Sequence, residues 1–116
     1  MTETGLQSQR KGKAGELELV SLLKEYGYNY VRRGKSLSYG KEPDASGLPG
    51  IHVEVKRRER LNLSKAMAQA VKDSRKFGDG FPAVFHRRNG EDWQVTMNLC
   101  DWIALYRKSK LEENEE

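Results

Sequence analysis

The segment PDASGLPGIHVEVK, residues 43–56, brings together Asp44, Glu54 and Lys56, whose side chains can bind a cation or move a proton. From Ile51 to Lys56 apolar and polar residues alternate, which is typical of a β-strand with one buried face. Glu54 and Lys56 should therefore share a face, with Cβ atoms about 6.5–7 Å apart. Glycine and proline in the preceding spacer predict a tight turn, and the resulting hairpin would bring Asp44 beside Glu54. Two converging carboxylates and an ammonium group can hold a divalent metal and orient a phosphate or a water molecule.

The composition indicates one modest domain with a basic body. The chain has 116 residues, enough for a single core, and 36% of them are hydrophobic while 33% are charged. The formal net charge is +4, but four of the seventeen acidic residues lie in the last five positions, which leaves about +8 on the rest. A basic body suits a polyanionic partner.

Several kinds of site are excluded or disfavoured. Cys100 is the only cysteine, so the chain has no internal disulfide and no cysteine-based zinc site. His52 and His86 are the only histidines, which disfavours a histidine-rich metal site. No apolar run approaches the ~20 residues that span a membrane, and the N-terminus lacks a signal-peptide core. We therefore expect a reduced, cytoplasmic protein without a membrane partner.

An apolar stripe predicts the first helix. Residues 1–9 are polar and expected to be disordered. The helix is expected over about residues 14–26, ending at Gly27, with a buried stripe of Leu19, Leu22, Leu23 and Tyr26. Glu16 then falls in the first helical turn, where a carboxylate can simply complement the helix dipole.

The remaining elements complete a mixed α/β order. We expect a strand at Tyr28–Arg32, a polar loop at 33–41 and the strand at 51–56. A helix capped by Ser64 should follow and reach about Phe77, and strands at 82–88 and 92–97 should be joined at Asn89-Gly90. The last helix should be capped by Asn98, with an apolar stripe made of Leu99, Trp102, Ile103 and Tyr106. The order is αβββαββα, a mixed central β-sheet flanked by helices.

Taken together, these motifs resemble a known family. They are the run RKGKAGELEL from Arg10 to Leu19, Arg32-Arg33 before a serine-containing loop, Pro43-Asp44, Glu54-Val55-Lys56, and Gln69 in the next helix. Over about residues 10–106 they resemble the PD-(D/E)xK nuclease superfamily and, within it, the archaeal-type Holliday junction resolvases and their phage relatives. The resemblance implies a restriction-endonuclease-like fold, with a nuclease domain at 10–108 and an acidic tail at 109–116.

The resemblance also implies roles for the site residues. Mg²⁺, for which Mn²⁺ can substitute, would be held by Asp44, Glu54, the backbone carbonyl of Val55, and Glu16 directly or through water. Lys56 would orient or activate the attacking water, and Gln69 would support the site from its helix. Independently of any family, phosphodiester hydrolysis needs charge neutralisation and a hydroxide-like nucleophile, and Mg²⁺ supplies both.

Two residues on the polar face of the strand have alternative explanations. Lys56 could form a salt bridge with Glu54 and nothing more, although this would leave Asp44 and Glu16 unexplained. His52 shares the face, and we expect it to be solvated or hydrogen-bonded rather than a metal ligand.

Basic and hydroxyl side chains around these motifs are candidates for contacts with DNA phosphates. They are Arg10, Lys11, Lys13, Arg32, Arg33, Ser36, Ser38, Arg57 and Arg58. Such contacts fix position without reading bases, and no base-reading module is recognisable. Recognition of DNA structure is therefore expected rather than recognition of sequence.

These observations lead to the hypothesis of a Mg²⁺-dependent, structure-selective endodeoxyribonuclease for branched DNA such as a four-way junction, in recombination and repair. Paired nicks need two sites, so a homodimer is expected. The alternatives are a flap- or nick-directed nuclease of the virus-type replication-repair nuclease family, or a non-catalytic DNA-binding protein of the same fold. The expected location is the cytoplasm of a bacterium or of a phage-infected host.

Overall fold

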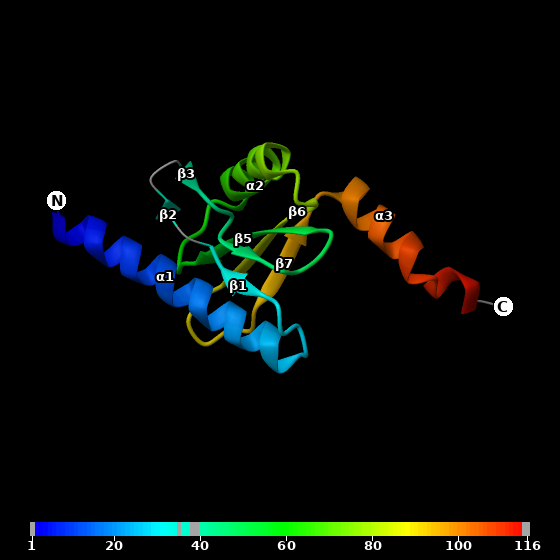
Figure 1. Ribbon diagram of the computed structural model, residues 1–116, viewed down its shortest axis with the longest axis horizontal. Helices are drawn as coiled ribbons and strands as arrows, with labels where there is room; N and C mark the ends of the chain where they lie inside the picture. Colours follow the sequence, from blue (N-terminus) through cyan, green and yellow to red (C-terminus); the bar gives the residue numbers. More distant parts are fainter. Residues whose placement is uncertain (1, 35, 38–39, 115–116) are drawn as a thin grey trace.

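The computed structural model describes residues 2–34, 36–37 and 40–114, with side chains for 12–34 and 41–113 (Figure 1). Within these residues the chain is an α/β protein with three α-helices and a five-stranded mixed sheet, which confirms the predicted class. The helices are α1 (Thr2–Glu25), α2 (Leu63–Phe77) and α3 (Leu99–Ser109), followed by the 3-10 turn η1 (Leu111–Asn114). The strands are β1 (Arg32–Arg33), β2 (Ser36–Leu37), β3 (Gly40–Lys41), β4 (Ala45–Ser46), β5 (Ile51–Arg57), β6 (Phe81–Arg87) and β7 (Gln94–Met97).

The main sheet has the strand order β1-β4-β5-β6-β7, with β5 at its centre. β5 and β6 are parallel, from Ile51 beside Phe81 to Arg57 beside Arg87, whereas the other neighbouring strands are antiparallel. A parallel pair needs a crossover connection, which α2 supplies. β2 and β3 pair separately as a short hairpin.

Helices cover both faces of β5, with α1 and α2 on opposite sides of the sheet in Figure 1. On the α1 side, Leu19 packs in one core with Val53. On the α2 side, apolar residues of the helix pack against Val84 in a second core. His52 and Glu54 are only 1% and 6% exposed. The prediction of a strand with one buried face was therefore wrong, because α2 covers the polar face as well.

The first helix is longer than the sequence pattern predicted. It begins at Thr2 rather than at about Ala14, so residues 2–9, which we expected to be disordered, are helical in the structure. Met1 lies outside the described residues, and the domain boundaries stay a prediction. At the other end Gly27 closes the helix as expected, with a φ of 103° and its N–H donating to the Lys24 carbonyl at 2.9 Å.

Two local predictions need correction. Tyr28 and Tyr30 lie outside any strand and are 51% and 90% exposed. The first strand therefore covers only Arg32–Arg33, and part of the expected 33–41 loop forms β2 and β3. The cap of α2 is Asn62, whose side chain accepts a hydrogen bond from the Lys65 N–H at 3.0 Å, and not Ser64. Asn62 directly precedes the first helical residue, as a cap must.

The last helix begins after Asn98 as predicted, but the Asn98 side chain makes no capping hydrogen bond with the described residues, and the apolar stripe of the helix is not buried against them. Leu99 and Trp102 are 73% and 48% exposed, and no residue of α3 is buried. Trp102 stacks on Tyr106 with ring centroids 5.2 Å apart. In Figure 1, α3 points away from the sheet. The helix therefore exposes apolar side chains to solvent.

Candidate metal centre

Asp44 is held against β5 by the backbone on both of its sides. Its Oδ2 accepts a hydrogen bond from the Val55 N–H at 2.8 Å, and its carbonyl accepts one from the Gly34 N–H at 2.9 Å. A Cβ at Gly34 would lie 1.7 Å from the Pro43 carbonyl oxygen, so this approach requires glycine. The hairpin thus brings the Asp44 carboxylate to the residue next to Glu54, as the sequence predicted.

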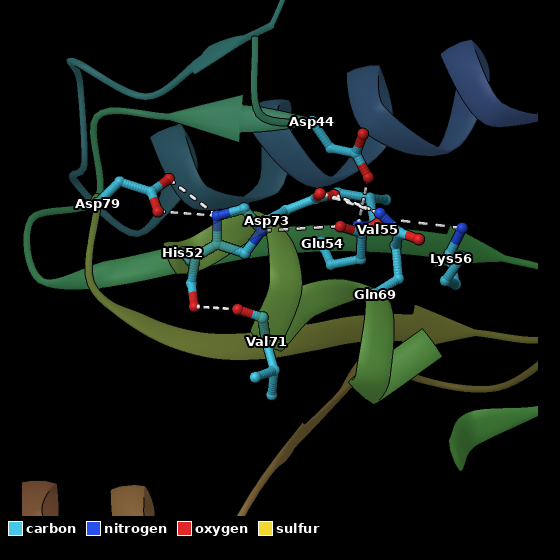
Figure 2. Close-up of polar contacts among 10 residues, drawn as sticks. Asp44, His52, Glu54, Val55, Lys56, Gln69, Val71, Asp73 and Asp79 are labelled. Carbon is cyan, nitrogen blue, oxygen red and sulfur yellow. Dashed lines mark hydrogen bonds and ion pairs between the residues drawn. The ribbon is translucent and has the colours of Figure 1, made fainter. Parts of the chain in front are cut away.

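One cavity of about 660 Å³ is lined by four of the five predicted catalytic residues, namely Glu16, Asp44, Glu54 and Lys56. Figure 2 shows Asp44, Glu54 and Lys56 turned toward one another along β5. The Lys56 ammonium lies 3.7 Å from Glu54 Oε2, so it pairs with that carboxylate and also borders the cavity. Val55 lines the cavity too, while a metal-binding role for its carbonyl stays a prediction.

Asp44 faces neighbouring carboxylates whose repulsion its own partners do not offset. Burial raises the pKa of Asp44 to about 7, and the charges of Glu54 and Glu16 act in the same direction. The Val55 N–H and the Lys56 ammonium oppose this shift without cancelling it. Carboxylates that repel each other in a partly buried cavity are stabilised by a bound cation, and their oxygens are the ligands that Mg²⁺ prefers. The donor set therefore fits a hard divalent metal.

Glu16 reaches the cavity from the middle of α1. Because the helix begins at Thr2, Glu16 is not in its first turn, and the helix-dipole explanation does not apply. Its Oε1 accepts a hydrogen bond from Arg33 Nε at 2.7 Å. The helix can approach because the preceding residue is Gly15, where a Cβ would lie 2.5 Å from Arg57 Cβ. Glu16 thus belongs to the cavity wall.

Gln69 contacts the site through a residue that the sequence analysis missed. Its Nε2 donates to both carboxylate oxygens of Asp73 at 2.9 Å, one turn further along α2. Ligand atoms of Asp73, His52 and Glu54 lie within 4.8 Å of one another (Figure 2). The i, i+4 spacing of Gln69 and Asp73 on one helix face was the signal that could have identified Asp73.

His52 is buried rather than solvated. Its Nδ1 lies 2.8 and 2.9 Å from the two carboxylate oxygens of Asp79, and its ring stacks on Phe77 with centroids 6.3 Å apart. Its Nε2 is buried without a hydrogen-bond partner among the described residues. Burial opposes protonation, but Glu54 and Asp79 raise the pKa of His52 above its ordinary value. Of the two expected alternatives, solvated or hydrogen-bonded, the structure shows the hydrogen-bonded one at Nδ1 and leaves Nε2 without a described partner.

Most predicted DNA contacts that the structure describes lie in ion pairs. Arg32 pairs with Glu42 at 3.0 Å, Arg33 with Glu16, and Arg57 with Glu18 at 3.4 Å. Lys13 is exposed on α1, and Arg58 borders the cavity without an ion pair to any described side chain. The side chains of Arg10, Lys11 and Ser36, and the whole of Ser38, lie outside the described residues. DNA contact by these residues stays a prediction.

Glu18 forms an anchor that sequence reasoning also missed. It accepts hydrogen bonds from Arg87 and from Trp93 Nε1, the latter at 3.0 Å, in addition to the contact with Arg57. Burial acts to raise its pKa, but the hydrogen bonds and charges of these partners hold the pKa of Glu18 below its usual value. The network ties α1 to the ends of β5 and β6.

The chain matches no protein-family model and no curated protein. Among the described residues, none of the helices combines the length and the apolar character that crossing a membrane would need.

Proposed function

We propose that the chain is a Mg²⁺-dependent, structure-selective endodeoxyribonuclease of the PD-(D/E)xK superfamily, of the Holliday junction resolvase kind. The observation that carries this proposal is the shared cavity of Asp44, Glu54, Lys56 and Glu16, in which the pKa of Asp44 is raised to about 7. Repulsion between the Asp44 carboxylate and those of Glu54 and Glu16 favours a divalent cation between them.

Each residue has a distinct chemical task in this proposal. Asp44 and Glu54 hold the metal, and Glu16 adds a ligand directly or through water. Mg²⁺ would supply charge neutralisation on the phosphate and a water of lowered pKa. Lys56, which is 20% exposed at its side chain and lies 3.7 Å from Glu54, orients the attacking water or the phosphate. Gln69 supports the arrangement through Asp73.

The order of elements supports the restriction-endonuclease-like fold. Along the chain, the helices and main-sheet strands follow as α1, β1, β4, β5, α2, β6, β7 and α3. With the separate β2-β3 pair set aside, this agrees with the order αβββαββα expected from the sequence patterns. The candidate ligands Asp44 and Glu54 lie on the turn before β4 and on β5, the pair that carries the family motif.

A basic surface beside the cavity supports the proposal of a DNA partner, and an apolar surface on α3 supports the proposal of a homodimer. Arg58 and Arg60 border the cavity, where they can neutralise phosphates beside the scissile bond. The exposed stripe of α3, with Leu99 and Trp102, offers an apolar surface of the kind that a second copy would bury. Two copies would supply the two sites that paired nicks require.

The deciding experiment incubates the protein with labelled four-way junction, flap and linear duplex DNA, with Mg²⁺ and with EDTA. We expect symmetric nicks in the junction, only with Mg²⁺. Equal or preferred cutting of flaps would instead favour a nuclease of the virus-type replication-repair kind. Binding without any cleavage, in Mg²⁺ or Mn²⁺, would make the protein a non-catalytic DNA-binding protein and overturn the proposal.

A further inference from the structure

The α2 face of β5 carries a second group of possible metal ligands, on the other side of Glu54 from Lys56. His52 and Glu54 come from β5 and Asp73 from α2, and one ligand atom from each lies within 4.8 Å of the others. Figure 2 shows the three side chains converging where α2 crosses the strand. Glu54 has one carboxylate oxygen on each side, since Oε1 lies 3.7 Å from His52 Nε2 and Oε2 lies 3.7 Å from the Lys56 ammonium.

The unpartnered nitrogen of His52 points to a ligand. The side chain is 1% exposed, and Nε2 lacks a hydrogen-bond partner among the described residues. The 3.7 Å separation from Glu54 is too long for a hydrogen bond. A buried polar atom without a partner costs about 1–3 kcal/mol, so a native structure normally supplies one. A cation between Nε2 and the two carboxylates would do so.

Asp79 prepares His52 for this role. With both Asp79 oxygens 2.8–2.9 Å from Nδ1, a neutral ring carries its proton on Nδ1 and turns the Nε2 lone pair toward Glu54 and Asp73. A carboxylate that accepts from the far nitrogen is the usual orienting partner of a metal-binding histidine. In the same way, Gln69 donates to both oxygens of Asp73 and fixes that carboxylate.

We propose that His52, Glu54 and Asp73 form a second metal site, for a divalent transition metal ion, with Asp79 as the positioning residue of His52. One imidazole nitrogen and two carboxylates suit Mn²⁺, Co²⁺ or Zn²⁺, whereas Mg²⁺ prefers oxygen ligands alone. Two ligands of a tetrahedral ion at about 2.1 Å are about 3.4 Å apart, so rotation of the Asp73 or Glu54 side chain would close the set. The site shares Glu54 with the candidate Mg²⁺ site but does not depend on nuclease activity.

The competing occupant is a proton. His52 as an imidazolium between Asp79 and Glu54 would satisfy the same charges without a metal. A metal must displace that proton, so its apparent affinity rises with pH, whereas a permanently held imidazolium would exclude the metal at all pH values near neutrality.

The test uses Co²⁺ alone, with the full chain and without DNA. Equilibrium dialysis measures affinity and stoichiometry, and visible absorption reports the ligand field of the bound ion. We expect His52→Gln and Asp73→Asn each to weaken this binding by at least about tenfold, and Asp79→Asn to weaken it by about 10–100-fold with an altered spectrum. Asp92→Asn, which changes an exposed carboxylate in the connection between β6 and β7, should bind as the wild type does.

Two further variants keep the outcome decisive. Asp73 is only partly buried, so Asp73→Asn should fold even if His52→Gln does not, and circular dichroism checks this. Asp44→Asn should leave the His52 site able to bind Co²⁺. If His52→Gln and Asp73→Asn bind Co²⁺ like the wild type, or if Asp44→Asn removes all Co²⁺ binding, the second site is overturned. A chain that binds Co²⁺ through His52 but cuts no DNA would overturn only the proposed nuclease function.

Discussion

Two carboxylates near α1, Glu18 and Asp44, have opposite electrostatic surroundings. Burial acts to raise the pKa of both. Glu18 accepts hydrogen bonds from Arg87, Trp93 and Arg57, and their effect lowers its pKa overall. Asp44 receives one backbone N–H and the influence of one lysine but faces other carboxylates, and its pKa rises to about 7.

The opposite pKa shifts of Glu18 and Asp44 distinguish a carboxylate that stabilises the fold from one that can bind a metal. A carboxylate whose charge is fully compensated by the protein contributes to stability and has no need of a further cation. A carboxylate cluster that the protein leaves undercompensated lowers its free energy when a cation or a proton arrives. By this criterion Glu18 holds α1 in place, whereas Asp44 is available for chemistry.

The largest expected effect is on cleavage. Asp44→Asn removes the charge that would hold the metal while keeping the side-chain shape, so junction cleavage should fall by at least about 100-fold, equivalent to roughly 2.7 kcal/mol of barrier. Junction affinity should change little, because in the proposed binding mode the phosphate contacts are made by arginines and not by Asp44. Single-turnover cleavage and gel-shift binding measure the two quantities.

Glu18→Gln is the matched contrast for this variant. It should cost about 1 kcal/mol of unfolding free energy, because Gln keeps the shape but loses the charge that Arg87 and Arg57 face. Its cleavage rate should stay within about threefold of the wild type. If Glu18→Gln lost activity as severely as Asp44→Asn, charge compensation would not distinguish the two roles.

The second prediction concerns pH and metal together. Asp44 has a folded pKa of about 7, above the ordinary value of 3.8. In the metal-free protein its contribution to stability is therefore fully present below about pH 4 and is lost as the pH rises through about 7. Binding of Mg²⁺ requires the carboxylate, so apparent affinity should rise up to about tenfold per pH unit below pH 7. Thermal melts from pH 5 to about 8, with and without Mg²⁺, measure both effects.

Asp44→Asn provides the control for this behaviour. Without the titrating carboxylate, the melting temperature should depend less on pH in this range, and Mg²⁺ should raise it less. Metal-induced stabilisation that is independent of pH and unchanged in Asp44→Asn would place the cation elsewhere.

The third prediction concerns Glu16, which lies two residues before Glu18 on the same helix but at the cavity. Glu16→Gln should lower cleavage by at least about tenfold, equivalent to about 1.4 kcal/mol of barrier, while junction affinity is unchanged or slightly improved. Excess Mg²⁺ or Mn²⁺ should recover part of the loss. Glu25→Gln, at an exposed position of α1, is the control and should cut normally. A full cleavage rate of Glu16→Gln at limiting Mg²⁺ would assign Glu16 to the Arg33 ion pair alone.

The approach of Asp44 to Glu54 and the later elements could be predicted from sequence, because they depend on local signals. Alternation and turn residues defined β5 and the hairpin before it, and Asn89-Gly90 marked the turn between β6 and β7. The order of the elements followed from the same patterns.

Burial of the polar face of β5 could not be predicted in this way. That face is covered by α2, and the partners of His52 come from positions far along the chain, Asp79 among them. Likewise Glu18 is compensated by Arg87 and Trp93, which only the folded sheet brings near it. A sequence pattern shows which residue types are present, whereas compensation of a charge depends on tertiary contacts.

The smallest expected effect concerns the cations themselves. Arg58 borders the cavity without an ion pair to a described side chain, whereas Arg57 pairs with Glu18. If the role of an arginine depends on whether a carboxylate already pairs with it, Arg58 is available to a DNA phosphate and Arg57 mainly supports the fold. Arg58→Ala should therefore weaken binding to all DNA sequences alike and reduce the slope of log K against log salt by about 0.9.

Arg57→Ala should instead lower the unfolding temperature and change that slope less. The measurement is fluorescence anisotropy with a labelled junction between about 50 and 200 mM salt, a range in which each phosphate contact changes the affinity by a few fold. Arg88→Ala controls for net charge alone, since Arg88 pairs with Glu91 on an exposed turn. Equal slopes for Arg58→Ala and Arg88→Ala would mean that net charge, not a contact at the cavity, sets the salt dependence. Arg58 would then be no closer to the DNA than an ordinary surface arginine.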